Sequence, residues 1–289
     1  MSSFTLKQLE ARITLAEGPF GGSGEGGNTK IVRLGMDVSI SKPGGAEKNK
    51  AQVKIYNMPL ADMEQLTTLA FRPLSVAKNV IAIYAGDETG LSLAFSGDII
   101  SAVPDFNAAP DPVFNLSCVT GYIATITAVP PHTHPGQVMA GDVLRDLAAA
   151  MSLTYAGQGD AVPLRNIALM GGPMEQARAV AEAARLELLV DDGEMLVKPV
   201  TTLRQTGETP VWSETTGLLG YPGFDNAGIV CRGIYEPRLR LGGPLSIRSV
   251  VPRASGLWRV TSLTHSLQAG YPGASRWESA VKAAWQEGA

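Results

Sequence analysis

With 289 residues, of which 45% are hydrophobic and 18% are charged, the chain is long enough for two or three domains that each bury a core. Its formal net charge of −3 excludes a broad basic surface that would hold nucleic acid through its phosphates. No apolar run approaches the roughly 18 residues that a membrane span needs, and the first residues lack a signal-peptide core, so we expect no membrane anchor and a protein made in a cytosol.

A glycine-rich stretch at residues 21–28, GGSGEGGN, has the spacing G-x-G-x-x-G at Gly22, Gly24 and Gly27, which is the fingerprint of a dinucleotide site. Such a site needs a strand before the glycines and a helix after them, so that phosphate meets the helix N-terminus. Residues 28–40 instead alternate and are rich in β-branched side chains, which predicts a second strand. We therefore interpret the stretch as a loop between antiparallel strands and expect no cofactor.

The first part of the chain, residues 1–129, is predicted to form a β-barrel-like domain with one inserted helix. Plentiful glycine and proline favour many short strands and turns over long helices. Alternating apolar and polar residues predict strands at 11–16, 28–40, 51–57, 79–86, 91–106 and 113–129.

A change of period interrupts these strands at residues 59–71. Pro59 suits the first turn of a helix, and Asn57 lies just upstream as a candidate cap. The apolar residues recur every three positions and would form one helical face: Leu60, Met63, Leu66 and Leu69. The segment is therefore predicted to be an amphipathic helix.

A small α/β module is predicted over residues 130–200. The proline-rich stretch PPHTHPG at 130–136 is expected to be a stiff connector and marks the first domain boundary. Beyond it, helices are predicted over 138–151 and 173–186, followed by a hairpin over 186–200 that turns at Asp191, Asp192 and Gly193. The inner faces of the two helices are predicted to carry Val143, Leu144, Leu147 and Met151, and Met174, Ala177, Ala181 and Ala184.

Residues 201–289 are predicted to form a second β-barrel-like domain. The fold class is thus mainly β with an inserted α/β module, in which two small β-barrel-like domains flank an α+β domain. The clearest strands of this last part are 228–236, 245–251, 256–268 and 276–285. In the final strand one face is predicted to carry Trp277, Ser279, Val281, Ala283 and Trp285, with a tryptophan anchoring each end.

The histidines are the first candidates for chemistry, because an enzyme needs a nucleophile with a base, tuned carboxylates or metal ligands. His132 and His134 would lie on one side of an extended chain, but two ligands do not complete a protein metal site. A solvated connector is the simpler interpretation. A metal shared across subunits, to which three chains would bring six imidazoles, stays open.

His265 is predicted to be a hydrogen-bonded structural histidine within a strand. It lies beside Leu263 and Leu267, and strict alternation would place it on the opposite face from Trp258 and Val260.

The remaining polar residues also have structural interpretations. Asp142 and Asp146 lie near a helix start, where acidic residues favour the dipole, and Asp191 and Asp192 are turn formers. The two cysteines, Cys118 and Cys231, are expected to be buried reduced thiols, and the tryptophans Trp212, Trp258, Trp277 and Trp285 to anchor a core or a subunit interface. We therefore assign no catalytic, cofactor-binding or metal-binding residue.

Several phrases are similar to those of bacteriophage baseplate hub and tail-tip hub proteins. VKIYNMPLADMEQL resembles a segment near the start of these proteins, LAFSGDIISAVP resembles the strand that follows, and AGDVLRDLAAAMSL looks like the helix that opens their inserted α/β piece. The C-terminal run LRLGGPLSIRSVV, GLWRVTSLTHSLQ and RWESAVKAAW is similar as well, with the family's positions at Gly256, Val260, His265, Trp277 and Ser279.

The resemblance implies a mechanical function. Hub proteins of this type form a homotrimer in which each chain contributes two small β-barrels to a ring of pseudo-sixfold symmetry. The ring would join the hexameric tail tube to the trimeric central spike and surround the channel through which DNA leaves. It implies a virion protein of the tail baseplate, assembled in the host cytoplasm, with the tube and spike proteins as partners and the tape measure and baseplate wedge or sheath-proximal proteins as further ones.

Two alternatives come from other classes of protein. A tail-associated cell-wall hydrolase would need an acid or nucleophile constellation that the sequence does not offer. A carbohydrate-binding β protein would use the tryptophans and would need no protein partners. The hub interpretation accounts together for the lack of an active-site pattern, the paired β domains and the low charge.

Overall fold

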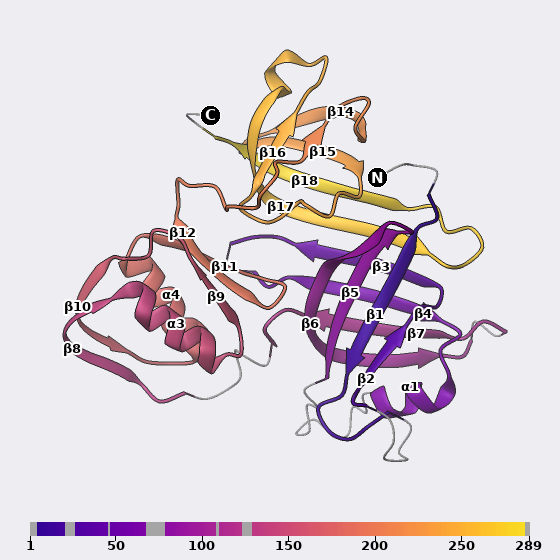
Figure 1. The fold of residues 1–289 in the computed structure, drawn as a ribbon, viewed down its shortest axis with the longest axis horizontal. Helices are drawn as coiled ribbons and strands as arrows, with labels where there is room; N and C mark the ends of the chain where they lie inside the picture. The colour runs from indigo at the N-terminus through magenta and orange to yellow at the C-terminus, as the bar shows by residue number, and fades with distance from the viewer. Residues whose placement is uncertain are drawn as a thin grey trace.

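The structure is a computed structural model and describes residues 5–20, 27–45, 47–67, 79–107, 110–122 and 129–286. The predicted fold class, mainly β with an inserted α/β module, is confirmed (Figure 1). We call the three parts the N-terminal β module, the α/β module and the C-terminal β module.

The N-terminal β module contains β1 (Gln8–Thr14), β2 (Thr29–Val32), β3 (Met36–Lys42), β4 (Lys50–Tyr56), α1 (Leu60–Leu66), β5 (Val80–Asp87), β6 (Gly90–Asp105) and β7 (Val113–Val119). The α/β module contains β8 (His132–Met139), α3 (Ala140–Ala150), β9 (Thr154–Gly157), β10 (Pro163–Leu169), α4 (Pro173–Ala183), β11 (Leu186–Asp191) and β12 (Glu194–Pro199). The C-terminal β module contains β13 (Val211–Trp212), β14 (Leu218–Asp225), β15 (Gly228–Ile234), β16 (Pro244–Ile247), the 3₁₀ turn η1 (Pro252–Ala254), β17 (Gly256–Ala269) and β18 (Trp277–Trp285).

One continuous sheet of 13 strands runs through both β modules, because β17 pairs antiparallel with β3. Its main path is β14-β15-β18-β17-β3-β4-β7-β6-β5-β1-β2, with β16 beside β17 and β13 beside β16. In the N-terminal β module the sheet curls, so that β1 and β5 cross in front of β3, β4 and β7 (Figure 1). The two β modules are therefore joined by backbone hydrogen bonds and not only by side-chain packing.

Strict alternation along the strands builds the core of the N-terminal β module. In β3, Met36, Val38 and Ile40 are fully buried, and the residues between them face outward. Burying each such side chain contributes roughly 1.5–3 kcal/mol. The inward residues of β1, β4, β5, β6 and β7 meet them in one cluster that also includes Leu267 and Trp277 of the C-terminal β module.

Two long strands change partners at a bulge. The first half of β6 pairs with β5 and its second half pairs with β7, and the register shifts between Ile99 and Ser101. Likewise, β17 pairs first with β16 and then with β3, and its register with β18 shifts between Val260 and Ser262. A bulge adds one residue and increases twist, which allows the sheet to bend at each of these two strands.

The helices of the α/β module bury the faces that the sequence predicts. Val143, Leu144 and Leu147 of α3 are at most 1% exposed, and α4 packs beside α3. The same core also includes the predicted residues Met151, Met174, Ala177, Ala181 and Ala184, and Met195 and Val197 of β12. The predicted hairpin is also confirmed, as β11 and β12 join through Asp192 and Gly193, both at positive φ.

Strand boundaries in the first 60 residues differ from prediction. The single strand expected over 28–40 is two strands, because β2 pairs with β1 whereas β3 pairs with β4 and β17. The antiparallel pairing of β1 and β2 agrees with a loop between strands; residues 21–26 of that loop, including Gly22 and Gly24, lie outside the described residues. The strand β2, and not a helix, follows Gly27.

The predicted helix over 59–71 is shorter and differently capped. The helix that the structure describes here is α1, Leu60–Leu66. Leu69 and the rest of the predicted last turn lie outside the described residues. Asn57 does not cap it: its φ is 57°, and its amide donates to Asp111 Oδ1 at 3.0 Å. Met63 is buried as predicted, but Leu60 is 55% exposed, so the expected apolar face is incomplete.

The proline-rich stretch 130–136 is not a connector but largely the strand β8. It pairs with β10, which the sequence did not predict, and the pairing has a bulge in β8, where Pro135 and Gly136 together lie opposite Asn166. The amide of Gly136 donates to the side chain of Asn166 at 2.9 Å, and this bulge accommodates the proline, which lacks a donor. The short strands β9 and β13 and the longer strand β14 are also absent from the prediction. In the part of the chain that the structure describes, no helix has the length and apolar character needed to cross a bilayer.

Candidate functional site

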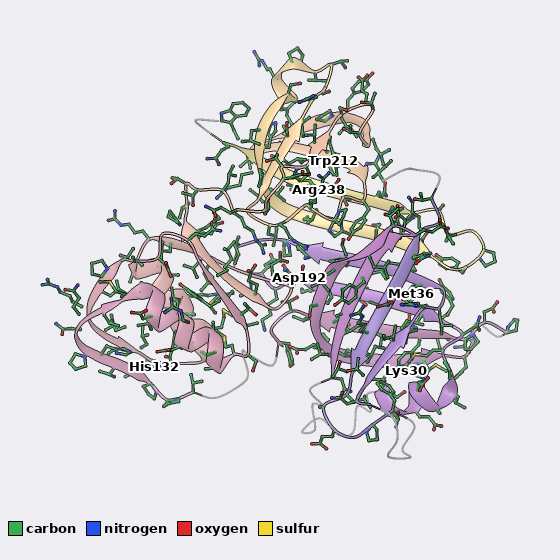
Figure 2. All side chains as sticks on the ribbon, viewed as in Figure 1. Lys30, Met36, His132, Asp192, Trp212 and Arg238 are labelled. Carbon is green, nitrogen blue, oxygen red and sulfur yellow. The ribbon has the colours of Figure 1, made fainter. Side chains whose placement is uncertain are left out.

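A cluster of buried charges lies where the three modules meet. Its centre is the tip of the β11–β12 hairpin, and Figure 2 shows Asp192 between the three modules. Lys42 comes from the end of β3. Arg204 comes from the segment between β12 and β13, and Arg240 from the segment between β15 and β16. We call these residues, with Asp191, the junction cluster.

Lys42 is the cation at the centre of this cluster. Its side chain is 0% exposed, and its Nζ lies 2.7 Å from Asp191 Oδ1 and 2.6 Å from Asp192 Oδ2. An isolated buried ammonium is very costly, so both carboxylates are needed to hold it. The N-terminal β module and the α/β module are joined by this pair of contacts.

The carboxylate of Asp191 accepts hydrogen bonds from three side chains. Its Oδ2 accepts from Arg204 Nη1 at 2.8 Å, and its Oδ1 accepts from Asn49 Nδ2 at 3.2 Å as well as from Lys42. Burial by itself raises the pKa of this carboxyl, but the cations of Lys42 and Arg204 outweigh burial and hold the pKa well below its ordinary value. Asp191 is therefore an anion in the folded chain.

Asp192 links the hairpin to the other two modules. Its Oδ1 accepts from the amide of Ser96 in β6 at 3.2 Å, and its Oδ2 lies 3.4 Å from Arg240 Nη1. Burial has the largest effect and raises the pKa of Asp192, the attraction of Lys42 opposes the rise, and repulsion from Asp191 adds to it. Arg240 also donates to the carbonyl of Leu93 in β6 at 3.4 Å.

A second ion pair lies within the α/β module and extends to the C-terminal β module through Arg259. Lys198 of β12 is 0% exposed and its Nζ lies 2.5 Å from Glu187 Oε2, which also accepts from Arg259 of β17 at 3.3 Å. Lys198 donates to the carbonyl of Thr202 at 2.7 Å. The middle module is thus fixed to both β modules by ion pairs.

The predicted structural role of His265 is confirmed. The ring is 2% exposed, its Nδ1 lies 2.7 Å from Ser279 Oγ, and Tyr235 packs edge-on against it. Burial, reinforced by the charges of Lys42 and Arg240, lowers the pKa of His265 to about 3. The imidazole is therefore neutral near pH 7.

The predicted orientation of His265 is wrong. Trp258 and Val260 are buried on the same side as Leu263, His265 and Leu267, because the bulge between Val260 and Ser262 reverses the alternation.

The other histidines lie far from the junction cluster. His132 and His134 stand on one side of β8 with rings 6.4 Å apart, as the sequence predicts. His132 Nδ1 lies 2.8 Å from the amide oxygen of the buried Gln176, so it takes part in the packing of α4. Within the described residues, no three histidine, cysteine, aspartate or glutamate side chains gather closely enough to hold a metal ion.

The remaining candidates occupy structural positions. Asp142 lies in the first turn of α3 and pairs with Arg145, and both cysteines are buried free thiols. Trp212, Trp258 and Trp277 are buried, but Trp285 is 55% exposed and stacks edge-on against Trp258. These tryptophans do not gather into a sugar-binding platform: three belong to cores.

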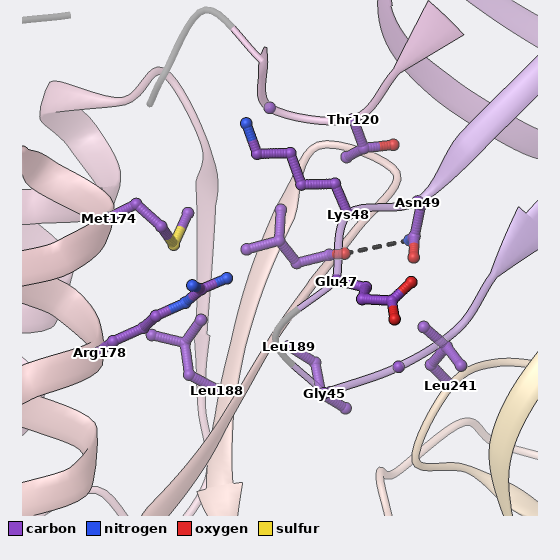
Figure 3. Close-up of a pocket in the computed structure, with 13 residues that line it drawn as sticks. Gly45, Glu47, Lys48, Asn49, Thr120, Met174, Arg178, Leu188, Leu189 and Leu241 are labelled. Carbon is purple, nitrogen blue, oxygen red and sulfur yellow. Dashed lines mark hydrogen bonds between the residues drawn. The ribbon is translucent and has the colours of Figure 1, made fainter. Parts of the chain in front are cut away.

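Two hollows border the junction cluster. One has a volume of about 30 Å³, room for only a few water molecules, and lies between α4, the hairpin and the loop after β3; its lining includes Lys48, Thr120, Met174, Arg178 and Leu189 (Figure 3). The other, of about 350 Å³, lies beside Arg204, Arg238 and Arg240. Each of these arginines already pairs with a carboxylate, so the larger hollow is not a free anion site.

The sequence reasoning missed the junction cluster, although one signal was available. Met36, Val38 and Ile40 alternate inward along β3, and continuing that alternation places Lys42 inward. A lysine on a core face requires a buried acid. The identity of that acid could not be found, since Asp191 lies 149 residues away and looked like a turn former.

Comparisons with known proteins give a consistent result. The family model described as Baseplate hub gp41 matches residues 23–270. Among solved structures, the chain is similar to the 43 kDa tail protein of prophage MuSo2 from Shewanella oneidensis, with a TM-score of 0.62 and 9% identity over 95% of this chain and 98% of that one. It is similar to the tail protein from Neisseria meningitidis MC58, with a TM-score of 0.61 and 10% identity over 97% of each chain.

A third solved structure comes from a secretion system. It is an E. coli protein described as a component of the type VI secretion system, with a TM-score of 0.56 and 8% identity over 88% of this chain and 74% of that one. At these identities the likeness shows the fold. The comparison with curated protein sequences finds no match.

Proposed function

Since the chain belongs to the baseplate hub gp41 family and is a structural protein of a phage tail, we propose that three copies form the ring that joins the hexameric tail tube to the trimeric spike and surrounds the DNA exit channel. The observation that carries the proposal is the extent of the family match, residues 23–270, which includes elements of all three modules. The protein is accordingly a component of the virion, and we propose that it is assembled in the host cytoplasm.

The junction cluster supports a mechanical function for this chain. Buried ion pairs connect all three modules, and β17–β3 pairing joins the two β modules along their strands. We propose that residues 1–129, 130–200 and 201–289 act as three modules of one rigid body. The net charge of −3 suits a channel that must release DNA.

The proposed ring implies which other tail proteins the chain contacts. The proposed partners are the tail tube protein on one side and the central spike protein on the other, with the tape measure and the baseplate wedge or sheath-proximal proteins as further ones. We propose that the chain itself has no catalytic role, since the buried carboxylates of the junction cluster pair with Lys42, Arg204 and Arg240, and the buried ring of His265 is neutral near pH 7.

Mass and symmetry test the proposal directly. Light scattering and class-averaged electron microscopy of the purified protein, alone and with its tube and spike proteins, should show a trimer with an open centre and a sixfold outline. A chain that stays monomeric with both partners present would refute the hub function. Turnover of peptidoglycan by the purified chain would instead favour the hydrolase.

A further inference from the structure

The outward side of β1 and of the two strands beside it carries two arginines and several apolar side chains. Residues of β1 alternate, so that Glu10 and Arg12 point away from the core. Pairing with β5 and β2 places Tyr84 opposite Glu10 and Ile31 opposite Arg12 on the same side. This side turns toward the viewer in Figure 1, where β1 and β5 lie in front of β3, β4 and β7. We call this surface the arginine face; it consists of Glu10, Arg12, Ile31, Arg33, Val80 and Tyr84.

Glu10 is buried although it points away from the core. Its side chain is 1% exposed and binds two guanidinium groups: Arg12 Nε lies 2.6 Å from Oε1, and Arg33 Nη2 lies 2.6 Å from Oε2. Burial by itself raises the pKa of this carboxyl, but the hydrogen bonds and charges of Arg12 and Arg33 outweigh burial and hold the pKa below its ordinary value. Glu10 is therefore an anion, and it neutralises one of the two positive charges.

Glu10 also fixes the position of both arginines. The guanidinium group of Arg12 packs over the ring of Tyr84, with its Cζ 4.2 Å from the ring centroid. The side chains of Arg12 and Arg33 nevertheless remain 44% and 69% exposed. A guanidinium group has five N–H donors in a rigid fork, which suits the two oxygens of a carboxylate. Arginines that are already held in place bind such a group at a lower entropic cost.

Apolar side chains lie beside the two arginines. Ile31 of β2 is 53% exposed, and Val80 at the start of β5 is 36% exposed. Arginine and aromatic residues are enriched at protein interfaces, whereas aspartate and glutamate are depleted there. The only acid of the arginine face is Glu10, which is covered. The face therefore has the composition of a protein-binding surface, with an excess of one positive charge in a chain whose net charge is −3.

The arginine face occurs once in each chain. The C-terminal β module has β16 and β13 in the places of β5 and β1, because the strand orders are β14-β15-β18-β17-β16-β13 and β3-β4-β7-β6-β5-β1. However, β13 has only two residues, and among the described strands none lies beside it in the place of β2. A ring of three chains would thus carry three arginine faces. That number matches a trimeric partner, whereas a hexameric partner would need six equivalent surfaces.

We infer that the arginine face binds the trimeric spike protein through an acidic side chain that lies between apolar ones. The carboxylate of the spike protein would bind Arg12 and Arg33, and its apolar side chains would cover Ile31 and Val80. This inference rests on the proposed ring and names the surface through which the ring holds the spike. An excess of one positive charge is too small to hold DNA through its phosphates, which favours a protein partner.

Photocrosslinking of the full chain, mixed with its spike and tube proteins, tests the contact. Ile31 is replaced by the photoreactive analogue p-benzoylphenylalanine, and the matched control carries the analogue at Met170, which is 78% exposed on the α/β module. Illumination should link residue 31 to a spike peptide that contains an aspartate or glutamate, as identified by mass spectrometry, and the control should not give this product. Links from residue 31 to the tube protein or to a second copy of the chain would overturn the inference.

Two substitutions give a second measurement. R33Q removes one positive charge and leaves Arg12 to pair with Glu10, and I31D changes an exposed side chain outside that pair. Melting temperatures should stay within a few degrees of the wild type. Each substitution should weaken spike binding about tenfold or more by titration calorimetry, and R165Q, at an exposed arginine of β10, should leave it unchanged.

The outcomes separate this surface from the hub function. Spike binding that survives R33Q and I31D unchanged would sink the inference while leaving the hub function standing. A wild-type chain that forms no ring and binds neither the spike nor the tube protein would refute both. Duplex DNA that is retained by the wild type and released by R33Q would assign the arginine face to phosphates and also overturn the inference.

Discussion

Lys42 and Asp191 are 149 residues apart in sequence, yet Nζ and Oδ1 lie 2.7 Å from each other and neither side chain is more than 1% exposed. The pair connects a strand of the N-terminal β module with the hairpin of the α/β module. A buried pair of this kind contributes little relative to an apolar pair, but removing one partner leaves an uncompensated charge.

Substituting Lys42 should therefore destabilise the whole chain. K42M leaves Asp191 and Asp192 without their shared cation, and we expect a loss of about 3–5 kcal/mol in the free energy of unfolding. Urea titration followed by circular dichroism measures it. The control K54M changes an exposed lysine of β4 and should cost less than about 0.5 kcal/mol. Equal losses for the two variants would mean that the junction cluster is not stabilised by charge.

The lowered pKa of His265 predicts how the free energy of unfolding depends on pH. Its folded pKa of about 3 lies below the ordinary value of 6.5, so the unfolded chain binds the extra proton first as pH falls. The stability contributed by the neutral ring is complete above about pH 6.5 and declines toward pH 3, with a loss of about 2 kcal/mol at pH 5. The free energy of unfolding, measured at several pH values, should change less steeply with pH in H265Q than in the wild type.

The matched control for this slope is H134Q, which changes a histidine on β8 outside the three cores. Its slope between pH 7 and pH 5 should equal that of the wild type. An unchanged slope in H265Q would remove the histidine from the explanation of acid sensitivity.

The two tryptophans of β18 should differ in their effect on stability. Trp277 is 9% exposed and packs against Tyr235, so W277A should cost about 3–5 kcal/mol. Trp285 is 55% exposed, and W285A should cost clearly less, about 1 kcal/mol. Chemical denaturation of both variants compares their free energies of unfolding. Similar losses for the two variants would show that Trp285, too, is packed in the protein as measured.

The glycine-rich loop should not bind nucleotides. Because β1 and β2 pair antiparallel and the strand β2 follows Gly27, the glycines are not followed by a helix N-terminus that would bind phosphate. Titration calorimetry with ATP and NAD should give no heat of binding for the intact chain or for a variant with residues 21–28 shortened. Measurable binding by the intact chain alone would assign the loop a nucleotide site.

Local patterns predicted much of the fold. The inner faces of α3 and α4 and the hairpin of β11 and β12 followed from periodicity and turn residues. The predictions failed where tertiary pairing outweighs local preference. Proline in β8 suggested a connector, but a bulge at Pro135 and Gly136 accommodates it, and the bulge in β17 reversed the predicted facing of His265.

The junction cluster could not be predicted from the sequence, because its contacts join residues that are far apart along the chain. Asp191 and Asp192 have the sequence of a turn and also serve as the buried anions for Lys42, Arg204 and Arg240. The two β modules also share one strand order, β3-β4-β7-β6-β5-β1 and β14-β15-β18-β17-β16-β13, which no local pattern in the sequence reports.

The pairing of β17 with β3 determines how the chain would carry load. The seven register pairs from Leu263–Lys42 to Ala269–Met36 lie side by side along two antiparallel strands. A pull that slides one β module along the other loads all of these pairs at once, whereas a pull that peels the strands apart loads them one after another. The joint is therefore stiff toward sliding along the strands and weaker toward peeling, and a force parallel to β17 would strain it least.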